Sequence, residues 1–174
     1  MSEFNETNGL KTKVEGRDLI IERILHAPRN QVFQAFSESE QLAGWWGPKG
    51  WKTENREFTF EPNGVWHYGM RCNDKSQGEF YGMESWGKAV FREIVPLEKI
   101  VYVDSFSDEE GNEVENMPEM LITLTFIDQG NHTKLIMRNQ FASVETLQQV
   151  MDMGVVEGAA SQMECLDDHL EEKK

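Results

Sequence analysis

The sequence predicts an α+β fold in which one curved antiparallel sheet lies against a long C-terminal helix. Three observations support this prediction. Seven segments between residues 19 and 141 are short, rich in β-branched and aromatic residues, and bounded by turn signals. Two short helix-like segments follow the first of them. Residues 143–170 contain no proline, and their apolar residues recur at helical spacing. Such a helix would be roughly 40 Å long at 1.5 Å per residue, so it needs a wide apolar partner, which a sheet supplies.

The predicted elements follow in a simple order. Residues 19–25 form the first strand, and Pro28 is well placed as the first residue of a short helix. A second short helix is expected from about 38 to 44. The remaining strands are expected at 54–60, 65–71, 86–95, 100–106, 119–127 and 133–141. Short links between consecutive strands favour antiparallel pairing, so we expect a sheet of about six to seven strands.

The C-terminal helix has clear start signals. Ser143 is a plausible N-cap, and Glu145 lies in the first turn, where a carboxylate suits the helix dipole. Gly154 and Gly158 both weaken a helix relative to alanine. They either allow the backbone to approach the sheet closely or leave space for a ligand between helix and sheet.

The composition describes an ordinary globular protein. The chain has 174 residues, of which 39% are hydrophobic and 28% charged, which fits one domain with a sizeable core. Residues 1–16 are polar and aperiodic and are expected to form a flexible arm, followed by a single domain over 17–172. The N-terminus lacks a basic region followed by an apolar one, so we expect a cytoplasmic protein with Cys72 and Cys165 as free thiols.

The net charge of −14 restricts the choice of partners. With 31 acidic and 17 basic residues, the surface would repel nucleic-acid phosphates and anionic lipids. No apolar run approaches the length of a membrane span. We therefore expect no nucleic-acid and no membrane partner.

Three tryptophans lie close together at Trp45, Trp46 and Trp51, separated by glycines and a proline. Tryptophan is large and is seldom left in water. This aromatic corner is either a plug that seals the sheet beneath the short helices or a wall of a cavity.

Few residues suggest chemistry. The four histidines show no metal-binding spacing, and no phosphate loop or nucleophile motif occurs, so no metal and no cofactor are expected. Glu93 follows apolar Phe91 at strand spacing. It is either a buried carboxylate with a raised pKa or half of a salt bridge on the outer face. Asp104 could place a polar group in a pocket, whereas His67 is expected to face solvent.

The chain resembles a known family through a series of short stretches that cover residues 17–170. These stretches, in chain order, are Ile21-Glu22-Arg23-Ile24 with Ala27-Pro28, Trp45-Trp46-Gly47-Pro48-Lys49-Gly50, Phe91-Arg92-Glu93-Ile94-Val95-Pro96, Ile100-Val101-Tyr102-Val103-Asp104-Ser105-Phe106, Met117-Pro118-Glu119-Met120, Phe141-Ala142-Ser143, and Met153-Gly154 with Glu157-Gly158. Their order is similar to the bacterial branch related to the C-terminal domain of the activator of Hsp90 ATPase. That branch shares the helix-grip fold of START domains, polyketide cyclases and Bet v 1-type plant proteins.

The resemblance implies a cavity between the sheet and the C-terminal helix that accepts apolar or aromatic molecules. The eukaryotic cochaperones of this family carry an additional N-terminal domain for which this chain has no room, so we do not expect Hsp90 stimulation. Many relatives have an aromatic residue just after the glycine that matches Gly158. This chain has Ala159 there, which predicts a larger pocket if the position faces inward.

The leading functional prediction is binding of a small hydrophobic or aromatic, lipid- or polyketide-like molecule in that cavity. The residues predicted to contact it are Trp46, Trp66, Tyr68, Met70, Glu93, Tyr102, Asp104, Ile122, Leu124, Met137, Met153, Gly154, Val156 and Ala160. One alternative is a cyclase- or hydrolase-like enzyme that uses Glu93 or Asp104 as the base and a tyrosine as the donor. Another is a protein-interaction domain, either a chaperone partner or a homodimer.

Overall fold

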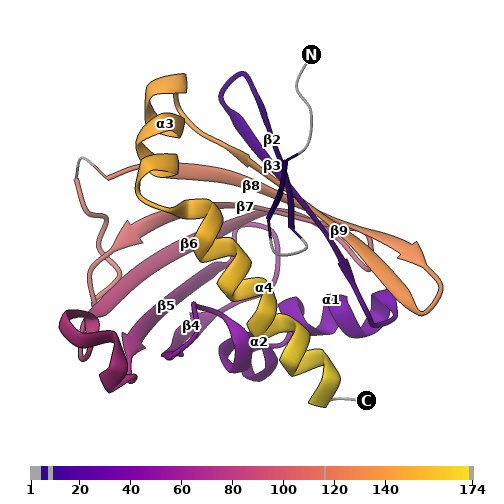
Figure 1. The fold of residues 1–174 in the computed structure, drawn as a ribbon, viewed down its shortest axis with the longest axis horizontal. Coiled ribbons are helices and arrows are strands. Elements are labelled where there is room, and N and C mark those ends of the chain that lie inside the picture. Colours follow the sequence, from indigo (N-terminus) through magenta and orange to yellow (C-terminus); the bar gives the residue numbers. More distant parts are fainter. Residues whose placement is uncertain (1–4, 8–9, 116, 173–174) are drawn as a thin grey trace.

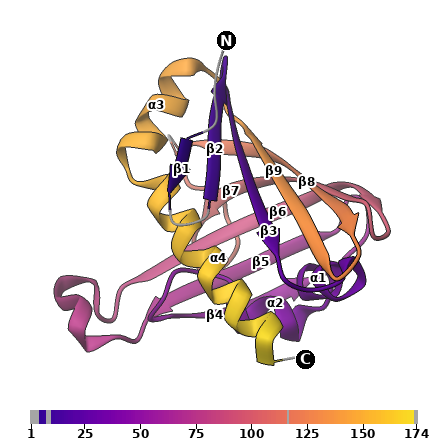
Figure 2. The same ribbon diagram turned by 45° about the vertical axis from the view of Figure 1, so that its right-hand side comes forward.

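The computed structural model describes residues 5–7, 10–115 and 117–172. The strands in these ranges form a single antiparallel sheet in the order β1-β2-β3-β9-β8-β7-β6-β5-β4. The strands are β1 (Asn5–Thr7), β2 (Leu10–Glu15), β3 (Asp18–Leu25), β4 (Trp51–Phe58), β5 (Val65–Cys72), β6 (Glu84–Val95), β7 (Lys99–Ser107), β8 (Glu119–Gln129) and β9 (His132–Gln140). The sheet is strongly curved, and the last helix crosses its concave face (Figures 1 and 2).

The described residues also form four α-helices and one 3-10 helix. They are α1 (Arg29–Ser37), α2 (Ser39–Trp45), the 3-10 helix η1 (Lys75–Phe80), α3 (Val144–Asp152) and α4 (Val155–Glu172). Figure 1 shows α1 and α2 near the C-terminal end of α4, with α3 at the opposite end. The α+β class, the curved antiparallel sheet and the two short helices after the first predicted strand are therefore confirmed.

The C-terminal helix is not continuous. Ser143 caps α3 as predicted, because its hydroxyl accepts a hydrogen bond from the Thr146 N–H at 3.1 Å. The chain then turns at Gly154, which has φ of +89°, a conformation that favours glycine. The prediction of one helix over 143–170 was therefore wrong, and Gly154 is the hinge between α3 and α4.

The expectation of a flexible arm over residues 1–16 was wrong for its described part. Strand β2 pairs antiparallel with β3, and β1 pairs with β2. Leu10 is fully buried and Thr12 is 7% exposed, so alternate residues of β2 face the core. These two strands raise the number of described strands to nine, above the predicted six to seven. Residues 1–4 and 8–9 of the predicted arm lie outside the described residues.

The core fills the space between the concave face of the sheet and the helices. Leu135 of β9, Leu124 of β8 and Leu166 of α4 are all at most 1% exposed. Both cysteines are free, as expected. None of the described helices is long and apolar enough to span a membrane.

Candidate functional site: a cavity between the sheet and α4

Strand alternation brings a set of large side chains to the concave face. Side chains in a strand point alternately to opposite faces, so Tyr68 and Met70 of β5 face inward together. On β7 the same rule places Tyr102, Asp104 and Phe106 on that face. Because β5, β6 and β7 are neighbours in the sheet, these five side chains form one continuous surface beneath α4.

A cavity of about 460 Å³ lies between this surface and α4. Its lining is mostly apolar and aromatic, with contributions from the sheet, the aromatic corner and the last helix. The lining residues are Ile21, Phe36, Trp46, Pro48, Tyr68, Met70, Tyr102, Asp104, Phe106, Met120, Ile122, Leu124, Met137, Asn139, Met153, Val155, Gly158, Ala159 and Gln162. Met153 is 61% exposed, so the cavity reaches the surface beside this residue.

Small residues of α4 leave room for the cavity. A Cβ atom added to Gly158 would meet no heavy atom within 4 Å, which means that open space lies beside this glycine. Ala159 also lines the cavity. Of the two roles considered for Gly158, close backbone approach does not hold, because this exposed residue has open space beside it, and space for a ligand stays a prediction. The inward position of Ala159 fulfils the condition under which a larger pocket was predicted.

Both roles considered for the aromatic corner occur: Trp45 is the plug, and Trp46 is part of a cavity wall. Trp45 is 2% exposed and donates a hydrogen bond from Nε1 to the Ala35 carbonyl at 2.9 Å, so it is a plug. Trp46 lines the cavity, and its ring lies edge-on to Tyr68 with 5.8 Å between centroids. Gln162 of α4 accepts a hydrogen bond from the Gly47 N–H at 3.2 Å, which connects this corner to the helix.

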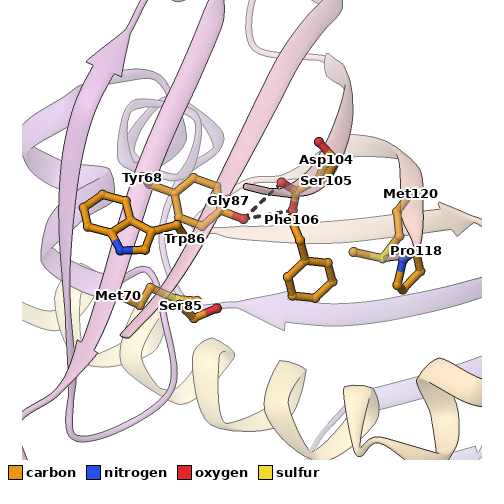
Figure 3. A pocket seen from close by; sticks show the side chains of 10 residues that line it. All are labelled: Tyr68, Met70, Ser85, Trp86, Gly87, Asp104, Ser105, Phe106, Pro118 and Met120. Atoms are coloured by element: carbon orange, nitrogen blue, oxygen red, sulfur yellow. Dashed lines mark hydrogen bonds between the residues drawn. The ribbon is translucent and has the colours of Figure 1, made fainter. Parts of the chain in front are cut away.

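The polar centre of the site is the pair Tyr68–Asp104. The Tyr68 hydroxyl lies 3.0 Å from both carboxylate oxygens of Asp104, to which it donates (Figure 3). The two residues come from strands separated by β6, where Gly87 is the register partner of Tyr68. A Cβ atom at Gly87 would lie 2.5 Å from the Tyr68 Cζ and hydroxyl oxygen. Only glycine at this position lets the Tyr68 ring reach across β6 to Asp104.

Burial sets the protonation of this pair. Asp104 is 7% exposed, and desolvation raises the pKa of its carboxyl to about 7, although hydrogen bonds from the Tyr68 hydroxyl and the Ser105 N–H act in the opposite direction. Burial, and then the nearby Asp104 charge, raises the pKa of Tyr68 well above its usual value, and the pKa of Tyr102 rises for the same reasons. The tyrosines therefore remain neutral donors, whereas Asp104 changes charge near neutral pH.

Two smaller hollows adjoin the cavity and share Phe106 and Met120 with it. One, of about 160 Å³, extends along the sheet past Gly87 and Trp86, and Figure 3 shows its lining. The other, of about 210 Å³, lies under the hinge at Gly154. Phe106 and Met120 therefore stand where the three spaces meet.

Most of the residues predicted to bind ligand line the main cavity. They are Trp46, Tyr68, Met70, Tyr102, Asp104, Ile122, Leu124, Met137 and Met153. Their contact with a ligand stays a prediction. Trp66 does not line the cavity: it is buried beside Tyr68, with 4.5 Å between the ring centroids, and its indole N–H donates to the Asn55 side chain at 2.9 Å. Gly154 lines the hollow under the hinge. Val156 and Ala160 do not line the cavity and instead pack in or against the core.

Glu93 lies outside the site. Its side chain is 52% exposed and forms an ion pair with Lys99 at 2.8 Å, so the outer salt bridge is the correct alternative. The cause is a β-bulge between Phe91 and Glu93, which reverses the face that simple alternation assigns to Glu93.

His67 also differs from expectation. It points to the outer face as alternation predicts, yet it is only 7% exposed. The loop after β7 covers it, and its Nε2 lies 3.1 Å from the Asp108 carbonyl oxygen. The prediction that His67 faces solvent was therefore wrong.

Several lining residues were missed by sequence reasoning. Phe106 and Met120 lie at strand ends and share the inward period of Tyr102 and Ile122, so the alternation that found their neighbours could have found them. Asn139 and Gln162 carried no such signal, because polar residues in these patterns are normally assigned to the solvent face. Within the described residues, no cluster of three or more histidine, cysteine or acidic side chains has the geometry of a metal site.

The fold and the cavity together define a helix-grip protein with a hollow between its sheet and its last helix. The sequence matches the family described as activator of Hsp90 ATPase homolog 1-like protein over residues 26–171, and the chain belongs to this family. Comparison with curated proteins gives no match in sequence.

Solved structures of bacterial proteins show the same fold. Protein Ms6760 from Mycobacterium smegmatis has a TM-score of 0.80 and 26% identity, with 97% of each chain covered. A protein from Staphylococcus epidermidis has a TM-score of 0.79 and 26% identity, with 94% of each chain covered. A protein from Arthrobacter aurescens has a TM-score of 0.82 and 24% identity, covering 98% of this chain and 91% of the other.

Proposed function

We propose that the protein binds a small apolar or aromatic molecule in the cavity between the sheet and α4. The observation that carries this proposal is the cavity itself. Its volume of about 460 Å³ falls within the range of about 300–1,000 Å³ that is usual for small-molecule sites. Its walls are apolar and aromatic with a few polar groups, which is also typical of such sites.

Binding would be driven by removal of apolar surface from water, and the polar pair would set the orientation. Met70, Met120 and Met137 line the cavity, and unbranched methionine side chains adapt to ligands of different shape. Asp104 supplies a hydrogen-bond acceptor whose charge changes with pH, and Tyr68 supplies a hydroxyl group on the same wall. The fold supports the same proposal, because proteins of this fold family commonly bind hydrophobic ligands.

The test is a titration with N-phenyl-1-naphthylamine, a neutral dye that becomes fluorescent in apolar surroundings. We expect saturable binding of one dye per chain. Ala159→Phe adds a ring at a position that lines the cavity, so it should abolish binding. Glu157→Leu adds apolar bulk at an exposed position of the same helix and should leave binding unchanged. Equal binding by wild type and Ala159→Phe would contradict the proposal.

A second candidate function is acid–base catalysis, and the specific observation that favours it is Asp104. A carboxyl group with a pKa of about 7 at a cavity wall, 3.0 Å from a tyrosine hydroxyl, is suited to accept and return a proton at neutral pH. Of the two carboxylates considered as the base, Asp104 lines the cavity, whereas Glu93 lies outside it. A panel of aromatic esters and cyclisable polyketones would test it. Turnover that disappears in Asp104→Asn while dye binding persists would support catalysis, and turnover that survives the substitution would exclude Asp104 as the base.

A further inference from the structure

The charge at the cavity wall is of one sign, negative. Among the described residues that line it, Asp104 is the only charged side chain. The two amide side chains are neutral: Asn139 Nδ2 donates to the Leu19 carbonyl at 3.2 Å, and Gln162 Oε1 accepts from the Gly47 N–H. The described lining of the two adjoining hollows adds no basic group. A ligand carboxylate or phosphate would therefore face a buried carboxyl group without a described cationic partner.

The aromatic rings of the cavity also favour a positively charged ligand. Phe36, Trp46, Tyr68, Tyr102 and Phe106 all line the cavity. The faces of such rings carry partial negative charge, so they attract a cation positioned over them, most strongly when water is excluded. Trp46, Tyr68 and Asp104 belong to one contacting group, since Trp46 lies 5.8 Å from Tyr68 and Tyr68 donates to Asp104. A cation beside Asp104 would meet rings as well as the carboxylate.

Resting on the proposed function, we propose that the ligand is an organic cation, with an apolar body and a protonated amine or quaternary ammonium group held beside Asp104. A buried charge is costly unless it is paired, and here each ion supplies the partner that the other lacks. The Tyr68 hydroxyl keeps its hydrogen bond to the carboxylate, which fixes the carboxylate for the incoming charge.

The same geometry gives binding a pH dependence. The titratable groups that face Asp104 are Tyr68 from β5 and Tyr102 from its own strand, and both stay neutral. The described residues of β6, β8 and α4 that line this space are uncharged. A fixed positive charge lowers the pKa of Asp104 from about 7, so a quaternary ammonium ligand binds more tightly as pH rises from 6 to 8. Binding near pH 6.5 releases a proton.

The test compares phenyltrimethylammonium with tert-butylbenzene, which has the same shape without the charge, and with phenylacetate, an anion. Calorimetric titration at pH 7.5 should show the cation binding at least about tenfold more tightly than the neutral compound, with phenylacetate the weakest. Asp104→Asn should weaken the cation by at least about tenfold and change tert-butylbenzene by less than about twofold. The wild-type pH profile and the proton release give a second readout that requires no variant.

The outcomes separate the two proposals. Tighter binding of tert-butylbenzene or phenylacetate than of the cation, or a cation affinity unchanged in Asp104→Asn, would overturn the cationic ligand and leave the proposed function standing. If none of the three compounds binds and the dye titration also fails to distinguish wild type from Ala159→Phe, both the cavity function and the ligand class are wrong.

Discussion

Replacing Asp104 by asparagine should stabilise the protein, and increasingly so as the pH rises. Asparagine has nearly the same shape and keeps an oxygen that can accept the Tyr68 hydrogen bond, but it cannot ionise. In the folded protein the carboxyl of Asp104 has a pKa of about 7, compared with 3.8 ordinarily. The folded state therefore holds this proton more tightly than the unfolded chain does, and wild-type stability falls between about pH 4 and pH 7.

The size of the effect follows from the two pKa values. At about 1.4 kcal/mol per pKa unit, the full cost of ionising Asp104 in the folded protein is roughly 4 kcal/mol above pH 7. Part of this cost is already present at pH 5.5. The stability advantage of Asp104→Asn should therefore grow by roughly 2 kcal/mol between pH 5.5 and pH 8. For a chain of this length that corresponds to a further rise in Tm of about 4–8 °C.

Urea unfolding of wild type and Asp104→Asn at the two pH values measures this difference directly, and any constant effect of the asparagine cancels. Glu93→Gln is the matched control, because it also neutralises a carboxylate but in an exposed ion pair with Lys99. Its effect should stay below about 1 kcal/mol at both pH values. An Asp104→Asn advantage that is the same at pH 5.5 and pH 8 would refute the buried, proton-retaining carboxyl group.

Three further predictions concern the same architecture. Gly87→Ala places a methyl group against the Tyr68 ring, so it should cost about 1–3 kcal/mol and raise the pKa of Asp104 in NMR titration, whereas an unchanged pKa would contradict the reach of Tyr68 across β6. Tyr68→Phe removes the donor that lowers the pKa of Asp104, so that pKa should also rise, and a fall would reverse the assigned role of the hydroxyl. Gly154→Ala strains a residue with φ of +89° and should lower the free energy of unfolding by about 1 kcal/mol in urea, whereas a gain in stability would indicate a continuous helix.

The fold was largely predictable because its signals are local. Asn63 and Gly64 sit in the turn between β4 and β5, and alternation along β7 correctly placed Tyr102 and Asp104 on one inward face. The family resemblance also implied a cavity between the sheet and the last helix, and the structure has one there. Turn residues and the alternation of side chains along strands are local signals, and the structure agrees with both.

The errors arise where a distant contact or a backbone irregularity decides the outcome. Residues 10–15 contain few apolar side chains, and they form a strand by pairing with β1 and β3. A one-residue bulge turned Glu93 outward, and bulges have no reliable signature in a single sequence. Gly154 was compatible with either a weakened helix or a hinge. Gly87 matters for the site only because Tyr68 lies across it, which the sequence does not reveal.

Methionine methyl resonances test the central claim most directly, because the chain carries its own reporters. Met70, Met120, Met137 and Met153 line the cavity, whereas Met83 is exposed on a loop outside its lining. Titration of methyl-labelled protein with tert-butylbenzene and phenyltrimethylammonium should shift the four cavity methyl signals in a saturable manner and leave Met83 unchanged. If the protein binds both compounds to saturation and the cavity methyl signals do not move, or if only the Met83 signal shifts, a ligand site between the sheet and α4 is contradicted.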